Sequence, residues 1–501
     1  MNIIWFKRDL RVSDHAPLTA AIESGRTLAL YILEPLMWKE KDLDTRHYQF
    51  LQESITDLSE QLNKINLPLT VKVGNVENIL KELHQRFGIE GVYSHQETWN
   101  DWTYQRDKRV EKLLNEHSIP WYQFQQNGVI RKLKSRNGWA KQWHQYMSET
   151  CKEAPNCVEG IADPSEDFPT LKEMGLVDNN CDARQAGGRH MALEHLSSFF
   201  TERGERYSKE MSSPLTAFES CSRISTYLAF GSVSVREVYQ LALLKKNKIY
   251  ADSKPGSTWR SSIRAFMSRL RWHCHFIQKL EDEPTLEFKN LHPSADGLRE
   301  SSFDTERFQA WQTGYTGYPF VDACMRALRT TGWINFRMRA MLVSFASYHL
   351  WLHWRQPSLH LARMFLDYEP GIHYSQIQMQ SGTTGINAIR IYNPIKQGMD
   401  QDPEGIFIKR WVPELSALSK NEIHTPWLTD ISSDVYPRPL IEEKTARREA
   451  SSKIYSIRRS PQFKKIAANI VEKHASRKQT GRSKPQKNIA SQKNWKQTDL
   501  F

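Results

Sequence analysis

A short acidic segment holds the first residues that could do chemistry. The stretch DYEPGIHYSQIQMQ, residues 367–380, contains Asp367, Glu369 and His373 and no Lys or Arg, in a chain whose formal net charge is +12. Histidine changes its charge near neutral pH, so His373 could exchange a proton with a bound cofactor. It could equally be an ordinary, partly buried histidine beside acids. The segment alone leaves both interpretations open.

Two arginines lie in a strongly apolar segment upstream of these acids. INFRMRA places Arg337 and Arg339 in a predicted hydrophobic helix. A buried guanidinium needs a counter-ion or an anionic ligand, because unpaired burial of charge is costly. Asp367 and Glu369 are the natural counter-ions, so we expect a polar site inside an apolar shell.

A third segment concentrates hydroxyls around an arginine. SCSRISTYLAFG carries four hydroxyl side chains and Arg223 where a helix is predicted to begin: Ser220, Ser222, Ser225 and Thr226. Hydroxyls, a guanidinium and unpaired backbone N–H groups at a helix start can converge on a diphosphate. A plain serine-capped helix is the alternative interpretation of this segment alone.

The first part of the chain predicts a parallel α/β domain. NIIWF, TLALYIL, PLTVKV and EGVYSH read as strands and alternate with helical stretches near residues 45–63, 75–87 and 103–117. This alternation is typical of a doubly wound sheet. Neither GxGxxG after the first strand nor GxxxxGK[ST] occurs, so dehydrogenase and P-loop chemistry have no support. We predict this domain for residues 1–130 and a Pro-, Gly-, Asp- and Asn-rich interdomain linker for residues 131–205.

The remainder of the globular part predicts an all-helical domain at residues 206–440. YPFVDACMRALRTTG has one apolar face and ends at Gly332. WINFRMRAMLVSFASYHLWLHW reads as one long buried helix, and the fold class is therefore α/β plus all-α. Residues 441–501 hold 16 Lys and Arg against 5 Asp and Glu. We expect a basic, largely disordered tail attracted to polyanions, with a purely solubilising tail as the alternative.

Composition excludes several classes of protein. The chain has 501 residues and six cysteines without CxxC pairs or zinc-like spacing, so we expect reduced thiols in a cytoplasmic protein. We also expect no association with a membrane. The sequence WHCH invites a metal site through His273 and His275. Positions i and i+2 face away from each other on a helix, so we predict no metal there. We expect a monomer.

The ordered set of motifs resembles the DNA photolyase and cryptochrome superfamily. WFKRDLRVSDHAPL, SRISTYLAFGSVSVRE, AWQTGYTGYPFVDACMRALRTTGWINFRMR, RIYNPIKQG and EGIFIKRWVPEL match in order over roughly residues 1–440. The resemblance implies FAD in the helical domain, blue-light absorption and light-driven electron transfer. It assigns to FAD the residues Tyr207, Ser222, Arg223, Ile224, Ser225, Arg339, Asp367, Tyr368 and Glu369, with Arg339 and Asp367 beside the isoalloxazine and Glu369 near its pyrimidine edge.

The sequence departs from the family pattern beside the flavin. His373 occupies the position where repair enzymes of the family usually carry an Asn facing the flavin N5 atom. The resemblance makes His373 a proton donor or acceptor at N5, with catalytic roles also assigned to Arg339 and Trp354. The protonation of the flavin radical could then respond to pH. A structural histidine remains the alternative.

Further departures lie at the expected DNA-binding mouth. Trp272 matches a family Trp that stacks on a flipped-out base. Arg269 replaces a Glu that hydrogen-bonds cyclobutane dimers, and Phe336 replaces a usual Asn, so lesion edges must be recognised differently. Gln397 completes the expected DNA-binding set. The DNA would be damaged and could be single-stranded.

The family's tryptophan relay is incomplete in this chain. Trp354 matches its middle member, but Ile377 occupies the flavin-proximal position and the outermost member falls near Ser301. Electrons must therefore take another route or come from an external reductant; the aromatic candidates for such a route are Trp351, Trp333, Tyr374 and Trp311. An antenna chromophore of unspecified identity would bind the α/β domain, where QETWNDW is a nearby segment.

The chain ends in a peptide with its own predicted partner. Gln497, Asp499, Leu500 and Phe501 of QTDLF resemble the short peptides by which bacterial repair and replication proteins dock on the sliding clamp. Nuclear import through RKQTGRSKPQK is the rival use of the tail.

Taken together, the motifs predict a photolyase-type flavoprotein that repairs UV-damaged pyrimidines. The alternative is a cryptochrome-like photoreceptor without repair activity.

Overall fold

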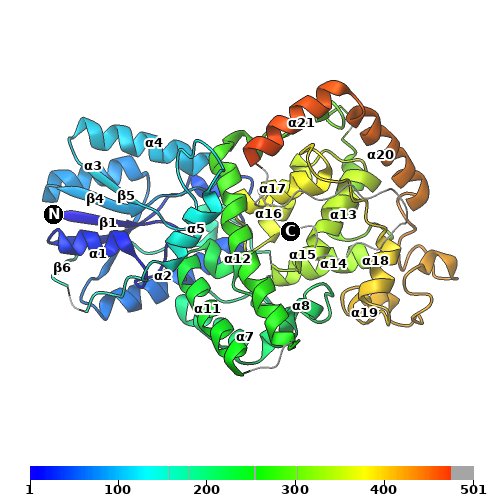
Figure 1. The fold of residues 1–501 in the computed structure, drawn as a ribbon, viewed down its shortest axis with the longest axis horizontal. Helices are drawn as coiled ribbons and strands as arrows, with labels where there is room; N and C mark the ends of the chain where they lie inside the picture. Colours follow the sequence, from blue (N-terminus) through cyan, green and yellow to red (C-terminus); the bar gives the residue numbers. More distant parts are fainter. Residues whose placement is uncertain (157, 180, 253–255, 302, 475–501) are drawn as a thin grey trace.

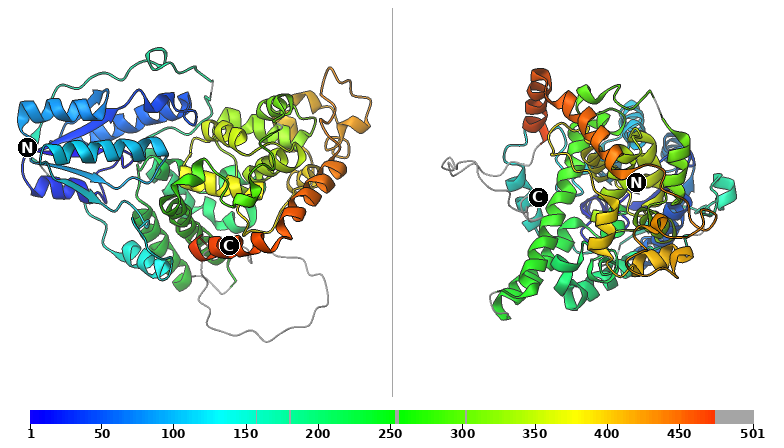
Figure 2. Two further views of the ribbon diagram at one scale, coloured as in Figure 1. Left: turned by 90° about the horizontal axis from the view of Figure 1, so that it is seen from above. Right: turned by 90° about the vertical axis from the view of Figure 1, so that its right-hand side faces the viewer.

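The computed structural model describes residues 1–156, 158–179, 181–252, 256–301 and 303–474. Figure 1 shows a sheet domain beside a larger helical domain, with the long helix α12 (Thr258–Asp282) running between them. Viewed at a right angle, the two parts again lie side by side (Figure 2). The predicted combination of an α/β domain and an all-helical domain is confirmed.

The sheet is parallel and doubly wound, as the alternating pattern predicts. Its strands lie in the order β3-β2-β1-β4-β5, and β6 pairs with β2 off this path. Their bounds are β1 Asn2–Phe6, β2 Thr27–Leu33, β3 Leu69–Val73, β4 Gly91–His95, β5 Trp121–Phe124 and β6 Gly160–Ile161. The alternation predicts the first four, whereas the last two are short, and β5 is only partly buried.

Alternate residues of each strand face two separate apolar cores, because successive side chains of a strand point to opposite faces. Ile4 and Phe6 join the large core shared with the helical domain, whereas Ile3 and Trp5 face a smaller core. Helices α3 (Val76–Phe87) and α4 (Asp101–Glu116) supply apolar side chains to the smaller core. Helix α2 (Thr45–Asn63) supplies apolar side chains to the larger core. Helix α1 (Ala16–Glu23) follows β1 in the chain and contributes Leu18 and Ala21 to the same core.

The segment predicted as a linker contains secondary structure. It includes α5 (Trp139–Ser148), strand β6, α6 (Leu171–Met174) and α7 (Arg189–Thr201). The bidentate contact of Arg184 with Glu53 ties this segment to α2. The connection between the domains is therefore fastened along the surface of the sheet domain.

The helical domain is built around α12 and α17. Besides α12, its α-helices up to residue 411 are α8 Tyr207–Glu210, α9 Ala217–Ser220, α10 Ser225–Ala229, α11 Val235–Asp252, α13 Thr305–Thr313, α14 Pro319–Thr331, α15 Phe336–Ser344, α16 Arg355–Met364, α17 Pro370–Ser381, α18 Pro394–Gln401 and α19 Ile406–Trp411. Gly332 ends α14 in the left-handed conformation, as predicted. In α17, Gly371 permits a close approach to α12, since a Cβ atom there would lie 2.5 Å from Ile277 Cα.

The single long helix predicted for residues 333–354 is wrong. Helix α15 begins only at Phe336, and a π-helical turn, Phe345–His349, follows it. At the junction the Ser344 hydroxyl donates to the carbonyl of Arg390 at 3.1 Å and accepts from the Tyr392 backbone N–H at 3.3 Å. These tertiary bonds lie where the helix changes type, and Trp351 then turns the chain with a φ of +56°.

The predicted disorder of the tail is wrong for its first part. Helices α20 (Glu443–Arg458) and α21 (Pro461–His474) pack along the helical domain (Figure 1). Their few apolar residues recur at helical spacing: Ala450 and Ile454 pack with Tyr348, and the Phe463 ring stacks on His292 with centroids 3.9 Å apart. Composition averaged over the whole tail hides this spacing.

Within the described part of the chain, none of the helices combines the length and apolar character needed to cross a lipid bilayer. The described cysteines, which exclude Cys157, are free thiols.

Candidate functional site

A cavity of about 320 Å³ in the helical domain collects most of the predicted site residues. Its wall comes from α8, α10, α12, α15, α17 and the loops preceding α10 and α17. All nine residues predicted to bind the cofactor line it: Tyr207, Ser222, Arg223, Ile224, Ser225, Arg339, Asp367, Tyr368 and Glu369. His373, Arg269, Trp272 and Phe336 line it as well. Segments more than 150 residues apart therefore form one site.

Arg339 and Asp367 form the charged pair of this cavity. Two parallel bonds of 2.9 Å join Arg339 Nη1 and Nη2 to the two carboxylate oxygens, and Arg339 Nε donates to the Ile334 carbonyl at 2.8 Å. Burial alone would raise the pKa of Asp367, but the charge and hydrogen bonds of Arg339 and a hydrogen bond from Ser225 hold it below its usual value. Asp367 is the counter-ion expected from the sequence, and the pair stays ionised.

Arg223 is held in a strained backbone conformation at the cavity wall. Its φ is +58°, which is unusual for a residue other than glycine. Its guanidinium lies 4.2 Å from the centroid of the Trp333 ring, and burial lowers its pKa to about 10. A cation fixed against an aromatic ring and facing a cavity suits an anionic ligand group.

Glu369 is the second acid of the cavity and has a different environment. It is the residue before Pro370, which begins α17. Burial raises the pKa of Glu369 to about 7, although the charge of Arg8 opposes the shift. The carboxyl group is therefore partly protonated at neutral pH, so it can donate as well as accept a hydrogen bond.

His373 lines the cavity and is anchored to the backbone of α16. Its Nε2 atom lies 2.9 Å from the backbone carbonyl of Ser358. A carbonyl only accepts, so Nε2 carries the proton and Nδ1 is the acceptor of the neutral ring. Burial lowers the pKa of His373 to about 3. Burial therefore favours the neutral ring near neutral pH.

The residues predicted to receive DNA share this cavity. The Trp272 ring stacks on Phe276 with centroids 5.4 Å apart, so one of its faces is supported by the protein. The Arg269 guanidinium lies 5.9 Å from the centroid of Phe336 and 4.0 Å from Met211 Sδ. This part of the wall combines an aromatic platform with a cation and apolar groups.

Two predicted site residues lie outside the lining of the cavity. Gln397 is on α18 and does not contribute to the wall. Trp354 is buried beneath the wall, where its Nε1–H donates to Asn290 Oδ1 at 2.7 Å and its ring meets Tyr374 edge-on at 6.3 Å. Trp354 therefore does not contact the space of the cavity directly.

Sequence reasoning also missed residues of the wall. Gln376 and Gln380 line the cavity together with His373 and Ile377. These four positions recur every three or four residues, the spacing that places them on one face of α17. That spacing is visible in the sequence and could have identified the two glutamines.

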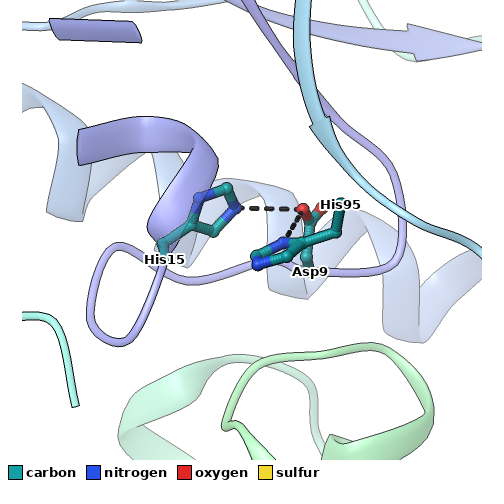
Figure 3. A group of neighbouring side chains, drawn as sticks. All are labelled: Asp9, His15 and His95. Atoms are coloured by element: carbon teal, nitrogen blue, oxygen red, sulfur yellow. Dashed lines mark hydrogen bonds and ion pairs between the residues drawn. The ribbon is translucent and has the colours of Figure 1, made fainter. Parts of the chain in front are cut away.

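A separate buried cluster joins Asp9, His15 and His95 at the carboxyl ends of β1 and β4 (Figure 3). In the described residues it is the one group of three or more acids, histidines or cysteines spaced closely enough to hold a metal ion. His95 Nδ1 lies 2.7 Å and His15 Nε2 3.0 Å from the same Asp9 oxygen. His15 Nδ1 accepts from the Leu18 N–H, so the His15 proton is on Nε2, the atom a metal would need. The cited contacts of the cluster lie within the sheet domain, and the two histidines share the Asp9 carboxylate.

The segment QETWNDW lines a much smaller cavity between the α/β domain and Phe230 and Tyr368 of the helical domain. This cavity measures about 40 Å³ and includes Glu97 and Trp99. Arg106 pairs there with Glu34 at 3.0 Å, and the Arg8 guanidinium lies 4.2 Å from the Trp99 ring centroid. A chromophore at this place would have to displace these side chains. The clamp-like peptide, with Gln497, Asp499, Leu500 and Phe501, lies outside the described residues.

Comparisons with known proteins agree with the fold and the cavity. A family model described as DNA photolyase matches residues 2–157, and one described as the FAD binding domain of DNA photolyase matches residues 266–456. The second match includes α12, α15 and α17 of the cavity and extends into α20.

Individual relatives match over most of their length. A deoxyribodipyrimidine photo-lyase of Vibrio cholerae is 28% identical over 476 residues, which is 91% of this chain and 99% of that protein. A cryptochrome DASH of Gloeobacter violaceus is 26% identical over 454 residues, 85% of this chain and 88% of that protein. A bacterial class III photolyase from Agrobacterium tumefaciens has a similar crystal structure, with a TM-score of 0.79 and 24% identity over 92% of this chain and 98% of that one. This last likeness shows a shared fold.

Proposed function

Because the chain belongs to the DNA photolyase and cryptochrome superfamily, we propose that it is a light-driven DNA repair enzyme that restores UV-damaged pyrimidines. The observation that carries this proposal is the shared cavity. Arg223, Arg339 and Asp367 line the same hollow as Trp272 and Arg269. A base flipped out of DNA and held by Trp272 would enter the space in which the cofactor binds.

The residues of the cavity fit FAD, the cofactor of this family's helical domain. Within the described part of the chain, the buried polar atoms of the wall that have no hydrogen-bond partner include Arg223 Nε, Glu369 Oε1 and Gln376 Oε1. These groups match the polar parts of a flavin nucleotide: the Arg223 cation suits a phosphate, and the partly protonated Glu369 and the Gln376 amide oxygen suit the polar edge of the ring. Apolar side chains form most of the remaining wall, as ring binding needs.

Bound FAD supplies an isoalloxazine ring that absorbs blue light and exchanges single electrons. The protein's own groups set the conditions for that chemistry. Arg339, fixed by Asp367, would supply a positive charge that favours the anionic, reduced form of the cofactor. Neutral His373 presents Nδ1 as an acceptor. The Arg223 guanidinium and the hydroxyls of Ser222 and Ser225 would hold the phosphates.

The DNA side of the cavity offers donors and aromatic surface. Trp272 would stack on a base, a contact worth about 1–3 kcal/mol. Arg269 presents hydrogen-bond donors where an acid would present acceptors, so it suits carbonyl oxygens of a damaged pyrimidine. Both a cyclobutane dimer and a (6-4) product carry such oxygens, and single-stranded DNA would reach the site with less unstacking.

The rival function is that of a blue-light photoreceptor without repair activity. One observation favours it: Arg269 lies against Phe336 and Met211, so an aromatic and a thioether group face a cation where an acid would hydrogen-bond a lesion. A cryptochrome is also among the similar proteins. In that case a redox change in the cavity would alter a partner surface.

We further propose that the protein acts as a monomer in the cytoplasm and reaches DNA through its basic tail. Residues 475–501 contain seven Lys and Arg against one Asp. Such a segment binds phosphates without regard to sequence. The terminal QTDLF would dock Leu500 and Phe501 in an apolar groove of the bacterial sliding clamp.

Binding of damaged DNA separates the two functions. We expect the full-length protein to bind an oligonucleotide with a pyrimidine lesion more tightly than an undamaged one at the same salt concentration. Trp272→Ala should remove the preference while leaving tail-dependent binding of undamaged DNA unchanged. Equal affinity of the wild-type protein for both oligonucleotides, with FAD bound, would favour the photoreceptor.

A further inference from the structure

Two arginines near the carboxyl end of α17 have buried guanidinium atoms and no acidic counter-ion in the described part of the chain. We infer that Arg299 and Arg458, together with the hydroxyl of Tyr348, form a binding site for a small oxyanion of the phosphate or sulfate class. All three residues lie outside the lining of the cavity, so the inference is independent of the proposed function.

The two arginines leave the same edge of the guanidinium group unpaired. Each donates one bond from Nη1 to a backbone carbonyl: Arg299 to Ser381 at 3.1 Å, and Arg458 to Asn387 at 2.8 Å. Within the described residues, Nε and Nη2 of both arginines are buried and have no hydrogen-bond partner. These two atoms form an edge with which an arginine can donate two parallel bonds to a carboxylate or phosphate. Two such edges in one cluster supply the donors of an oxyanion site.

Tyr348 lies between the two arginines in the packing of the domain. The Arg299 guanidinium lies 5.4 Å from the centroid of the Tyr348 ring. Helix α20 packs on the same tyrosine through Ala450 and Ile454, and Arg458 follows Ile454 by one turn. Burial raises the pKa of Tyr348 to about 12, and the positive charges of Arg299 and Arg458 oppose that rise. The Tyr348 hydroxyl is itself buried without a partner among the described residues, so it adds a fifth unpaired donor.

The charges of this cluster are predominantly positive. Lys453 Nζ lies 4.7 Å from the centroid of the Trp351 ring, and the Arg299 guanidinium lies 4.5 Å from the same centroid. The neighbouring acid, Glu300, accepts from the backbone N–H of Arg299 at 2.9 Å and lies 3.6 Å from His353 Nε2. Its carboxylate is therefore engaged away from the unpaired edge of Arg299.

Burial without a partner is costly for a guanidinium group. Burial lowers the pKa of Arg299 to about 10 and also lowers the pKa of Arg458. Both arginines nevertheless stay charged at neutral pH, so their charge must be compensated by another group. Ordered water would satisfy the donors but not the charge. A bound oxyanion does both, because its oxygens accept from the guanidinium edges and its charge offsets theirs.

The burial of Arg299 restricts the ligand to a small free ion. Arg299 is 1% exposed, so the phosphate of an intact DNA strand does not reach it, whereas a free ion can enter when α20 opens locally. A tetrahedral oxyanion offers several acceptor oxygens to the unpaired donors, but chloride offers a single centre. We therefore expect phosphate and sulfate to bind more tightly than chloride.

Occupation of the site would hold three segments together. Arg458 belongs to α20, Tyr348 belongs to the π-helical turn, and Arg299 is bonded to Ser381, the last residue of α17. Bound phosphate should therefore slow the local opening of α20, because the ligand binds only while that helix is docked.

The test uses full-length protein loaded with FAD and titrated with inorganic phosphate at fixed pH and ionic strength, with chloride as the balancing ion. Isothermal titration calorimetry should show one saturable site, and hydrogen exchange in α20 should slow as phosphate is added. Arg299→Gln and Arg458→Lys should each weaken phosphate binding by about tenfold or more, because each loses a bidentate contact. Arg458→Lys keeps the charge and so separates the paired bonds from simple ionic attraction.

The matched control is Arg448→Gln, at an exposed position of the same helix, which should bind phosphate as the wild type does. Circular dichroism and FAD absorbance confirm that each variant is folded and loaded. Phosphate binding that is absent, or equal in the wild type and both site variants, would overturn the inference, with ordered water alone at the cluster. Chloride binding as tight as phosphate binding would contradict the oxyanion class. None of these measurements uses light or DNA, so a failure of the proposed function would leave their results unchanged.

Discussion

At the scale of the residue, two acids two positions apart differ in the direction of their pKa shifts. Asp367 faces the bidentate fork of Arg339 and stays charged, whereas Glu369 is buried with only a distant cation and is half protonated near neutral pH. The difference comes from the partner of each carboxyl group. It divides the cavity into a permanently ionic part and a part whose charge follows pH.

Removal of Arg339 should destabilise the protein, because Asp367 would then be a buried and weakly compensated charge. We expect Arg339→Ala to lower the free energy of unfolding by about 3 kcal/mol and Arg339→Lys by less, since lysine keeps the charge but loses the fork. Urea denaturation and FAD absorbance measure both effects. The control is Arg109→Ala, whose exposed pair with Glu77 should contribute less than about 1 kcal/mol. Equal losses in the two alanine variants would contradict the role of burial.

Glu369 should make stability depend on pH. Its pKa is about 7 in the folded protein and 4.5 in the unfolded chain. The folded state therefore holds an extra proton between these values, and this stabilisation is lost as pH rises through 7. We expect Glu369→Gln to gain about 2 kcal/mol more relative to wild type at pH 8 than at pH 5.

Urea midpoints of FAD-free protein at the two pH values measure this difference. The same gain at both would show that Glu369 does not titrate in this range.

At the scale of the element, α21 illustrates how a few apolar residues fix a basic helix. Phe463 and Ile470 are buried, and Lys473 pairs with Glu283 near the end of α12. Phe463→Ala should cost about 3 kcal/mol of local docking, because a stacked ring is lost. Faster hydrogen exchange confined to α21 would show this. Val471→Ala, at a 45% exposed position, is the control. Unchanged protection of α21 in Phe463→Ala would mean that other contacts hold the helix.

Elements formed by local sequence pattern could be predicted, whereas elements that depend on contacts between distant residues could not. Apolar runs and period identified β1 to β4 and α2 to α4, because local pattern decides those elements. The end of α15 depends on bonds from Ser344 to residues nearly fifty positions away, which no local pattern contains. Helix α21 was not predicted, because the charge averaged over the tail concealed the helical spacing of Phe463 and Ile470.

At the scale of the whole molecule, the cavity depends on how the two domains meet. Buried Arg46 on α2 donates to the Met364 carbonyl at 2.9 Å, and neighbouring His47 lies 2.8 Å from the Phe365 carbonyl. Asp42 approaches Tyr368 across the same boundary. The motifs predicted which residues line the cavity, but these contacts between domains, including the partner of Tyr368, could be seen only in three dimensions.

The basic tail should set nonspecific affinity for DNA without affecting lesion preference. Deletion of residues 475–501 removes seven Lys and Arg. The slope of log affinity for undamaged duplex DNA against log salt should become shallower by up to about 6. Fluorescence anisotropy at several salt concentrations measures it, and an unchanged slope would exclude the tail from DNA contact.

The central claim is that one cavity brings a damaged pyrimidine to FAD. The most direct measurement is blue-light turnover of oligonucleotides that carry either a cyclobutane dimer or a (6-4) product, using chemically reduced full-length protein and chromatography of the restored bases. We predict multiple turnovers on one of the two lesions, none in the dark, and a strong loss with Trp272→Ala. If neither lesion is restored by protein that contains reduced FAD, the account of this chain as a repair enzyme is contradicted.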